Sequence, residues 1–176
     1  GGRRGSKHGP ECLIHQYSKM QNHSGLKTQV VTLKTKNAYR DLSSNQDLYK
    51  TQLKEILSKK STLVHLGGGH DHVYPLLSEL TACLDQNKDS KLYVLNIDAH
   101  LDTRQDKAVH SGTPFRQWIN ELSSANKNRS QFLQVGIEKE YNTATNYQFS
   151  DEFMQVLHHD DFAKETNSFV QLGSTT

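Results

Sequence analysis

The sequence is poor in several features that would point to a function class by composition alone. Its 176 residues include only 2 cysteines and 3 prolines, and the formal net charge is only +2 at pH 7. Cys12 and Cys83 lie far apart and outside any Cys-x-x-Cys spacing, so neither a disulfide framework nor a zinc ribbon is supported. We expect both thiols to be inert packing residues.

Runs of like charge and long apolar runs are also missing. Because the basic residues are spread along the chain, nucleic acid is not indicated as a partner. No stretch approaches the roughly 20 apolar residues that cross a bilayer, and the first residues lack the apolar core of a secretory signal. These absences favour a soluble, cytoplasmic protein with no membrane partner.

The apolar residues that are present recur at helical spacing in several segments. With 34% hydrophobic residues, the chain can bury one core, so a single domain is expected. Apolar faces and helix-start signals predict helices over residues 10–17, 41–60, 74–85, 114–123 and 151–159. The β-branched run 30–33 fits either a strand or an extended loop.

Short apolar runs alternate with these helices. The runs 62–66, 91–98 and 131–137 predict strands, and the first two are so apolar that burial on both faces is expected. Strands that alternate with helices at this spacing indicate βαβ units, and therefore an α/β fold with a parallel sheet between helical layers. Polar residues that follow such strands emerge together at the carboxyl edge of the sheet, where ligands bind.

Three metal-competent side chains follow the second predicted strand. Asp98, His100 and Asp102 occupy alternate positions, which share one face of an extended chain. The first predicted strand ends in three glycines and His70, which can reach across to the same edge. Carboxylates with a neutral imidazole suit an ion such as Mn²⁺, and the second histidine favours a metal site over a simple turn and cap.

Other side chains near these motifs have two interpretations each. Asp71 and His72 either orient a ligand or are ordinary solvated loop residues. His65, inside an apolar run, is expected to be a core histidine. Phe115, Trp118 and Phe132 are expected to pack in the core.

Three segments together resemble consecutive signatures of the ureohydrolase family, which includes arginase, agmatinase and formimidoylglutamase. They are residues 67–71 (Gly-Gly-Gly-His-Asp), 96–104 (Asn-Ile-Asp-Ala-His-Leu-Asp-Thr-Arg) and 111–117 (Ser-Gly-Thr-Pro-Phe-Arg-Gln). The last is most similar to formimidoylglutamase, since arginases usually have a histidine where Ser111 stands. The opening residues 1–10 also resemble the Gly-rich loop of the family, and 135–137 its next core strand.

The resemblance implies an arginase-like αβα fold and two Mn²⁺ ions. His70 and Asp102 would bind one ion, His100 the other, and Asp98 would bridge both. It further implies a hydroxide shared by the ions as nucleophile, and a small-molecule amidine as substrate. The implied reaction belongs to histidine degradation and converts N-formimidoyl-L-glutamate to L-glutamate and formamide. Family likeness also suggests a homo-oligomer.

The sequence departs from the family pattern downstream. The family supplies two further carboxylate ligands from a Ser-x-Asp-x-Asp type motif, and none follows Ile137. Asp151, Asp160 and Asp161 are not expected to replace them, because no predicted strand precedes them. We therefore expect residues 1–176 to be one partial domain, truncated at both ends and inactive in isolation.

Candidate substrate contacts lie beside the predicted metal ligands. Ser111 offers a hydroxyl and Gly112 a backbone N–H. Arg104 could pair with a substrate carboxylate or form a surface ion pair, and His110 is either a substrate contact or a polar loop residue. Glu138 could anchor an amidinium group or be a simple loop carboxylate.

Other functions stay open at this point. A sibling activity would be that of an agmatinase or another guanidino or amidino hydrolase. A non-catalytic metal-binding or oligomer-forming remnant is compatible with the missing carboxylate motif. A nucleotide-binding domain is disfavoured, because residues 67–69 lack the further glycine spacing and the acidic partner of that motif.

Overall fold

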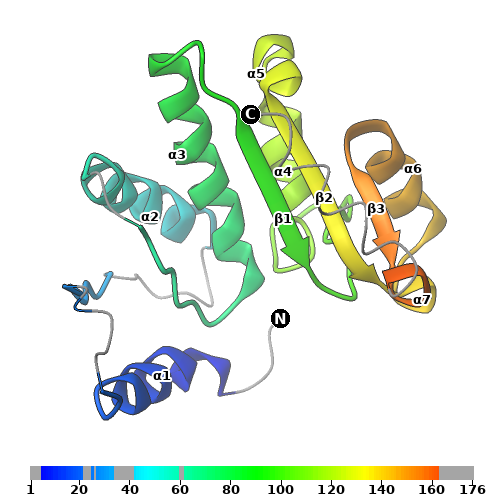
Figure 1. Cartoon of the computed structure of the whole chain (residues 1–176). Helices are drawn as coiled ribbons and strands as arrows, with labels where there is room; N and C mark the ends of the chain where they lie inside the picture. The colour runs from blue at the N-terminus through cyan, green and yellow to red at the C-terminus, as the bar shows by residue number, and fades with distance from the viewer. Residues whose placement is uncertain (1–4, 22–24, 26, 34–41, 60–61, 163–176) are drawn as a thin grey trace.

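The computed structural model describes residues 5–21, 25, 27–33, 42–59 and 62–162 (Figure 1). The strands are β1 (Leu92–Ile97), β2 (Ser130–Ile137) and β3 (Gln155–His158). The helices are α1 (Gly9–Tyr17), α2 (Leu42–Leu57), α3 (Val73–Gln86), α4 (Pro114–Glu121), α5 (Ser124–Arg129), α6 (Ala144–Phe153) and α7 (His159–Phe162). Single 3-10 turns are η1 (Ser6–His8), η2 (His70–His72) and η3 (Lys139–Tyr141).

The strands form one parallel sheet in the order β1-β2-β3. Leu92 pairs with Ser130 and Ile97 with Val135, which confirms two of the predicted strands and the predicted parallel α/β architecture. The register between β2 and β3 shifts at Gly136, whose φ of 80° favours glycine. A Cβ there would lie 3.7 Å from the Asp98 carbonyl oxygen, so this irregularity adjoins the first predicted metal ligand.

The core lies between the sheet and the helices α3 and α4. Its buried members are Tyr74, Leu77, Phe115, Trp118, Ile119 and Phe132. The helical spacing of the α3 and α4 residues turns their apolar sides toward the sheet, which confirms the expected packing of the three aromatic residues. The Trp118 indole N–H donates to Thr81 Oγ1 at 2.9 Å, so burying this ring leaves no unpaired donor.

The opposite face of β1 is open in the described part of the chain. Alternate side chains of this strand are exposed, and Ile97 retains 77% of its surface. Helices α4 and α6 lie behind the sheet in Figure 1, and no described helix covers the front of β1. The prediction that this strand is buried on both faces is therefore wrong for the described residues, because helices cover only one of its sides.

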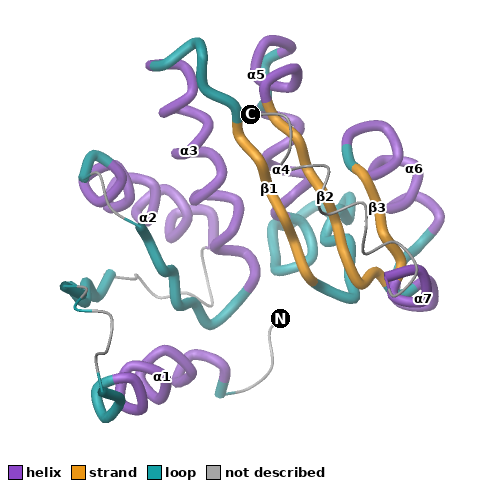
Figure 2. Tube along the Cα trace, viewed as in Figure 1, coloured by secondary structure: helices purple, strands orange, loops and turns teal. Residues whose placement is uncertain are grey.

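Residues 62–69, which we call the approach segment, connect α2 to η2 without joining the sheet (Figure 2). The predicted strand 62–66 is wrong, and Val64 is 75% exposed. His65 is half-buried against the rings of Tyr49 and His72, at centroid distances of 5.2 and 6.0 Å. An apolar run becomes a strand only with a hydrogen-bonded neighbour, and no described strand pairs with this one.

The C-terminal region differs from the prediction as well. The expected helix 151–159 is replaced by the end of α6, the strand β3 and the short α7. Helix α6 starts earlier because the Thr143 side chain accepts a hydrogen bond from the Asn146 N–H, and it ends where Met154 is extended (φ −142°, ψ 158°).

The remaining expectations have mixed outcomes. Helices α1 to α4 confirm the predicted ones, and residues 30–33 have no regular secondary structure. The first four residues of the expected Gly-rich loop lie outside the described residues, while η1 and α1 replace its later part. Cys12 and Cys83 are exposed, so they are not packing thiols: α1 buries no residue, and Cys83 lies on the outer side of α3.

No helix in the described ranges combines the length and the apolar character that crossing a bilayer requires.

Candidate metal centre

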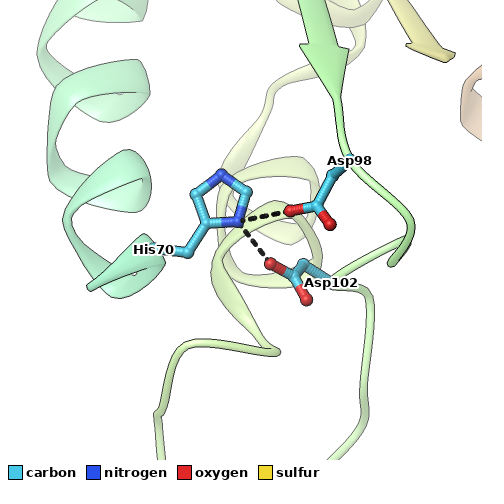
Figure 3. Close-up of side chains that lie close together, drawn as sticks. All are labelled: His70, Asp98 and Asp102. Carbon is cyan, nitrogen blue, oxygen red and sulfur yellow. Dashed lines mark hydrogen bonds and ion pairs between the residues drawn. The ribbon is translucent and has the colours of Figure 1, made fainter. Parts of the chain in front are cut away.

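Three of the predicted ligands meet in one cluster at the carboxyl edge of the sheet (Figure 3). His70 Nδ1 lies 2.5 Å from Asp102 Oδ2 and 3.4 Å from Asp98 Oδ2. One ligand atom from each residue lies within 4.8 Å of the others. Among the described residues, this is the one group of three or more such side chains that could hold a metal ion.

Each member reaches the cluster from a different local structure. Asp98 directly follows β1, and its N–H donates to the Val135 carbonyl at 3.1 Å, which extends the β1–β2 pairing by one residue. His70 opens η2, just before α3, and its ring meets Phe115 edge-on at 5.6 Å. Asp102 has a φ of 48°, in the left-handed region that aspartate enters more readily than most residues.

Asp98 faces two histidines with its two carboxylate oxygens. While Oδ2 faces His70, Oδ1 lies 3.3 Å from His100 Nδ1 and accepts the His100 backbone N–H at 3.0 Å. The His100 side chain is 46% exposed and stacks on Tyr141, with ring centroids 5.5 Å apart and planes at 20°. His100 thus lies beside the cluster of three, on the far oxygen of Asp98.

The charge balance of the cluster favours a cation. The pKa of His70 is raised, first by its hydrogen bond to Asp102 and then by the charges of Asp102, Asp98 and Asp71, against the opposing effect of burial. The carboxylates that stabilise an imidazolium would equally stabilise a divalent ion bound to the neutral ring. Oxygen and imidazole donors at this spacing fit Mn²⁺.

Residues 98–103, which we call the ligand loop, are held along their whole length. Leu101 donates its N–H to Asn142 Oδ1 at 2.8 Å and accepts from Gln134 Nε2 at 2.9 Å. Arg116 Nε donates to the Thr103 carbonyl at 2.6 Å. Neither Asn142 nor Gln134 was predicted from the sequence, although an amide inside the apolar strand 131–137 is a signal of a buried polar contact.

The segment that carries Ser111 and Gly112 folds back onto the end of the ligand loop. The Arg104 N–H donates to the Gly112 carbonyl at 2.9 Å, and the Gly112 N–H donates to His110 Nδ1 at 2.9 Å. His110 Nε2 lies 2.6 Å from Asp106 Oδ2, so both ring nitrogens are engaged inside this segment. A Cβ on Gly112 would lie 3.0 Å from the His110 ring, so a larger residue would require that ring to move.

The other predicted substrate contacts lie near the cluster without being part of it. Ser111 is half-buried between His110 and Gly112. Arg104 is exposed and lines a hollow with Asp106 and Arg116, and no member of the cluster lines that hollow. Glu138 donates its N–H to the Ala99 carbonyl at 3.1 Å, while its carboxylate lies 3.4 Å from His159 Nδ1.

Asp71 and His72, the loop residues with two possible interpretations, contact other residues of the fold. The Asp71 carbonyl accepts from Gln46 Nε2 at 3.2 Å, and its carboxylate lies 3.7 Å from His72 Nε2. His72 also packs edge-on against Tyr49. Asp160 is 90% exposed beside His159, outside the metal-type cluster.

The chain is similar in sequence to curated formimidoylglutamases. The formimidoylglutamase of Cupriavidus pinatubonensis is 32% identical over 143 residues, covering 81% of this chain and 45% of that protein. The formimidoylglutamase of Staphylococcus haemolyticus is 28% identical over 152 residues, covering 86% and 46%. The chain therefore spans about half the length of the curated relatives it matches.

The fold is similar to that of a Trypanosoma cruzi formiminoglutamase variant crystallised with Mn²⁺. The TM-score is 0.75 at 22% identity, over 98% of this chain and 59% of the other. This likeness confirms the expected fold class, an incomplete arginase-like αβα architecture. A profile of the arginase family also matches residues 1–171. This chain belongs to the arginase family.

Proposed function

We propose that this chain is the metal-binding part of a manganese-dependent formimidoylglutamase. The observation that carries the proposal is the placement of Asp98, whose two oxygens face different histidines. A carboxylate in that position could hold two ions at once, one beside each histidine, as two-metal hydrolases require. The names of the curated relatives support formimidoyl-glutamate as substrate.

The residues divide naturally between two ions. His70 and Asp102 would bind one ion with Asp98 Oδ2, and His100 would bind the other with Asp98 Oδ1. When bound, two adjacent cations lower the pKa of a shared water and stabilise the negative charge that develops at the amidine carbon.

The reaction proposed is hydrolysis of the bond between the formimino carbon and the glutamate nitrogen. Water adds to the carbon, the C–N bond breaks, and the nitrogen leaves with a proton, giving L-glutamate and formamide. We assign this activity to cytoplasmic histidine degradation and to a homo-oligomeric enzyme, as the family resemblance suggests.

The hydrogen bonds of residues 110–112 support one choice of substrate contacts. The Gly112 N–H already donates to His110, so the Ser111 hydroxyl is the better candidate for binding the substrate. Gly112 then acts sterically, by letting the chain pass close to His110 and Arg104. Arg104 would pair with a substrate carboxylate, and Glu138 would meet the amidinium only after leaving His159.

The test uses the protein expressed from its complete gene. With added Mn²⁺, we expect formimidoyl-glutamate to give the highest kcat/KM in a panel that includes agmatine, arginine and other guanidino acids. Preference for a guanidine would replace the proposed substrate with that of the sibling enzymes. No turnover of any compound would favour a metal-binding remnant.

The 176-residue chain by itself is expected to be inactive, because its proposed ligands fill only part of two coordination shells. Assay of the purified chain with Mn²⁺ and formimidoyl-glutamate checks this expectation. Substantial turnover would show that the residues present here suffice for the reaction.

A further inference from the structure

We propose that Asn142 is a positioning residue that holds the ligand loop in the conformation needed for metal binding. The part of this proposal that concerns metal binding rests on the function proposed above. Asn142 follows η3, the 3-10 turn after β2, and lies 41 residues from the loop residue whose N–H it accepts. The hydrogen bonds of its side chain go to backbone groups and not to the proposed ligand side chains.

One amide side chain makes three hydrogen bonds here. Asn142 Oδ1 accepts the Leu101 N–H at 2.8 Å, and Nδ2 donates to the carbonyls of Ala99 at 3.0 Å and Glu138 at 2.8 Å. The acceptor and both amide hydrogens are therefore used. The contacts join the ligand loop to the turn after the neighbouring strand.

The position of these bonds matters more than their number. Ala99 and Leu101 separate Asp98, His100 and Asp102, so bonds to Ala99 and Leu101 determine how the peptide planes between the ligands are turned. Leu101 is fully buried, and a buried N–H without a partner is costly. Gln134 holds the carbonyl of the same residue, so Leu101 cannot rotate freely in either direction.

The residue before Asn142 braces the loop in a second way. Tyr141 stacks on the His100 ring, which is otherwise about half exposed. The two neighbouring residues thus hold the backbone between the ligands and the plane of one ligand ring. We call Tyr141 and Asn142 the brace.

The fold does not depend on the brace alone. The two ends of the loop are anchored independently, by the Asp98 N–H on Val135 and by the Asp102 carbonyl, which accepts the Phe115 N–H at 3.3 Å. Loss of the brace should therefore loosen the middle of the loop while the sheet and α4 persist. The expected consequence is weaker metal binding beyond any loss of stability.

The decisive comparison is Asn142→Ala against Asn126→Ala. Asn126 is also a hydrogen-bonded asparagine, bound to Asp85 and Arg129, but it lies on α5. We expect Asn142→Ala to weaken Mn²⁺ binding by about tenfold or more, measured by titration calorimetry, and Asn126→Ala to leave it unchanged. Equal affinities in the two variants would overturn the proposal, whatever their melting temperatures.

Conservative variants distinguish the contributions of the individual contacts that Asn142 and Tyr141 make. Asn142→Asp keeps the acceptor for the Leu101 N–H but loses the donor to two carbonyls, so its affinity should fall between those of wild type and Asn142→Ala. Tyr141→Phe keeps the ring stack and should bind Mn²⁺ like wild type, whereas Tyr141→Ala should not. A Phe variant as weak as the Ala variant would contradict the stacking role.

Amide hydrogen exchange without metal tests the brace independently of the proposed function. The Leu101 amide should exchange at least about tenfold faster in Asn142→Ala, which removes its acceptor, than in wild type, with β2 amides unchanged. An unchanged rate would show that Asn142 does not hold the loop. Failure of the wild-type chain to bind Mn²⁺ would instead contradict the proposed metal site, and the exchange rates would still decide whether Asn142 holds the loop.

Discussion

The ligand loop and the approach segment lead to the same cluster but are held in different ways. Within the loop, Leu101 and Thr103 are fully buried, and its backbone is bonded to β2, α4 and the turn after η3. In the approach segment, Leu63, Val64 and Leu66 are exposed and no described strand pairs with them. The loop carries Asp98, His100 and Asp102, and the approach segment leads directly to His70, so the comparison shows which side of the site is preorganised.

The carboxylate side is built into the sheet edge, whereas the His70 side depends on a single turn. Asp98 is in place as soon as β1 and β2 pair, because its N–H belongs to their hydrogen-bond pattern. His70 is placed by η2 and by its contacts with Asp102 and Phe115. The cluster therefore depends on how η2 and α3 pack beside the ligand loop.

Removal of Asp98 should have the largest effect. Asp98→Ala deletes the carboxylate shared by both proposed ions, and we expect Mn²⁺ affinity to fall by at least about 100-fold. The metal content of the purified protein checks this, with exposed Asp89→Ala as the control. Unchanged manganese in Asp98→Ala would overturn the site assignment.

Stability should respond to the loop far more than to the approach segment. Gln134 is fully buried, and Gln134→Ala leaves the Leu101 carbonyl and the Asn96 side chain without this partner, so the free energy of unfolding should fall by about 2 kcal/mol. Val64→Ala should change it by less than about 0.5 kcal/mol, since this side chain is 75% exposed. Urea unfolding compares the two variants, and equal losses would break the contrast between the regions.

A smaller effect is expected from His70 as pH changes. Because its pKa is raised in the folded state, protonated His70 contributes stability that is fully present below the unfolded pKa of about 6.5 and is lost as pH rises through the folded value. Urea unfolding of metal-free wild type and His70→Gln should therefore differ most at acidic pH. A difference that grows with pH would refute the assignment of the Asp102 hydrogen bond as its cause.

His65 should show the opposite and smallest pH response. Burial, and then the proximity of His72, lower the pKa of His65, so protonation opposes folding and stability is lost as pH falls below about 6.5 toward the folded pKa. His65→Asn should reduce this acid sensitivity in the same unfolding series. If its acid sensitivity matches that of wild type, the Tyr49–His65 contact does not desolvate the ring.

The spacing of apolar residues correctly predicted the helices and strands that pack one apolar face against the rest of the fold. Helices α2, α3 and α4 and the strands β1 and β2 have apolar faces that can be read directly. The run 62–66 has the same composition as a buried strand, but strand formation also needs a partner, which local sequence does not specify. The short β3 was missed because its two apolar residues, Val156 and Leu157, also fit a helix.

The site was predictable where chemistry and spacing coincide. Asp98 and Asp102 share a loop after a strand, and His70 follows the glycines, so three residues of the cluster could be named from the sequence. The brace could not, because Asn142 and Tyr141 act on residues about 40 positions earlier, through one backbone N–H and one ring face. Such contacts depend on how the turn after β2 meets the turn after β1.

The left-handed backbone of Asp102 restricts which acidic residue can serve there. A φ of 48° is accessible to aspartate and asparagine but strained for longer side chains. Glutamate would keep the negative charge while opposing the local chain conformation, and asparagine would keep the conformation while losing the charge. A residue at position 102 therefore has to supply a negative charge and also tolerate the left-handed backbone conformation. Of the two acidic residues, aspartate alone meets both requirements.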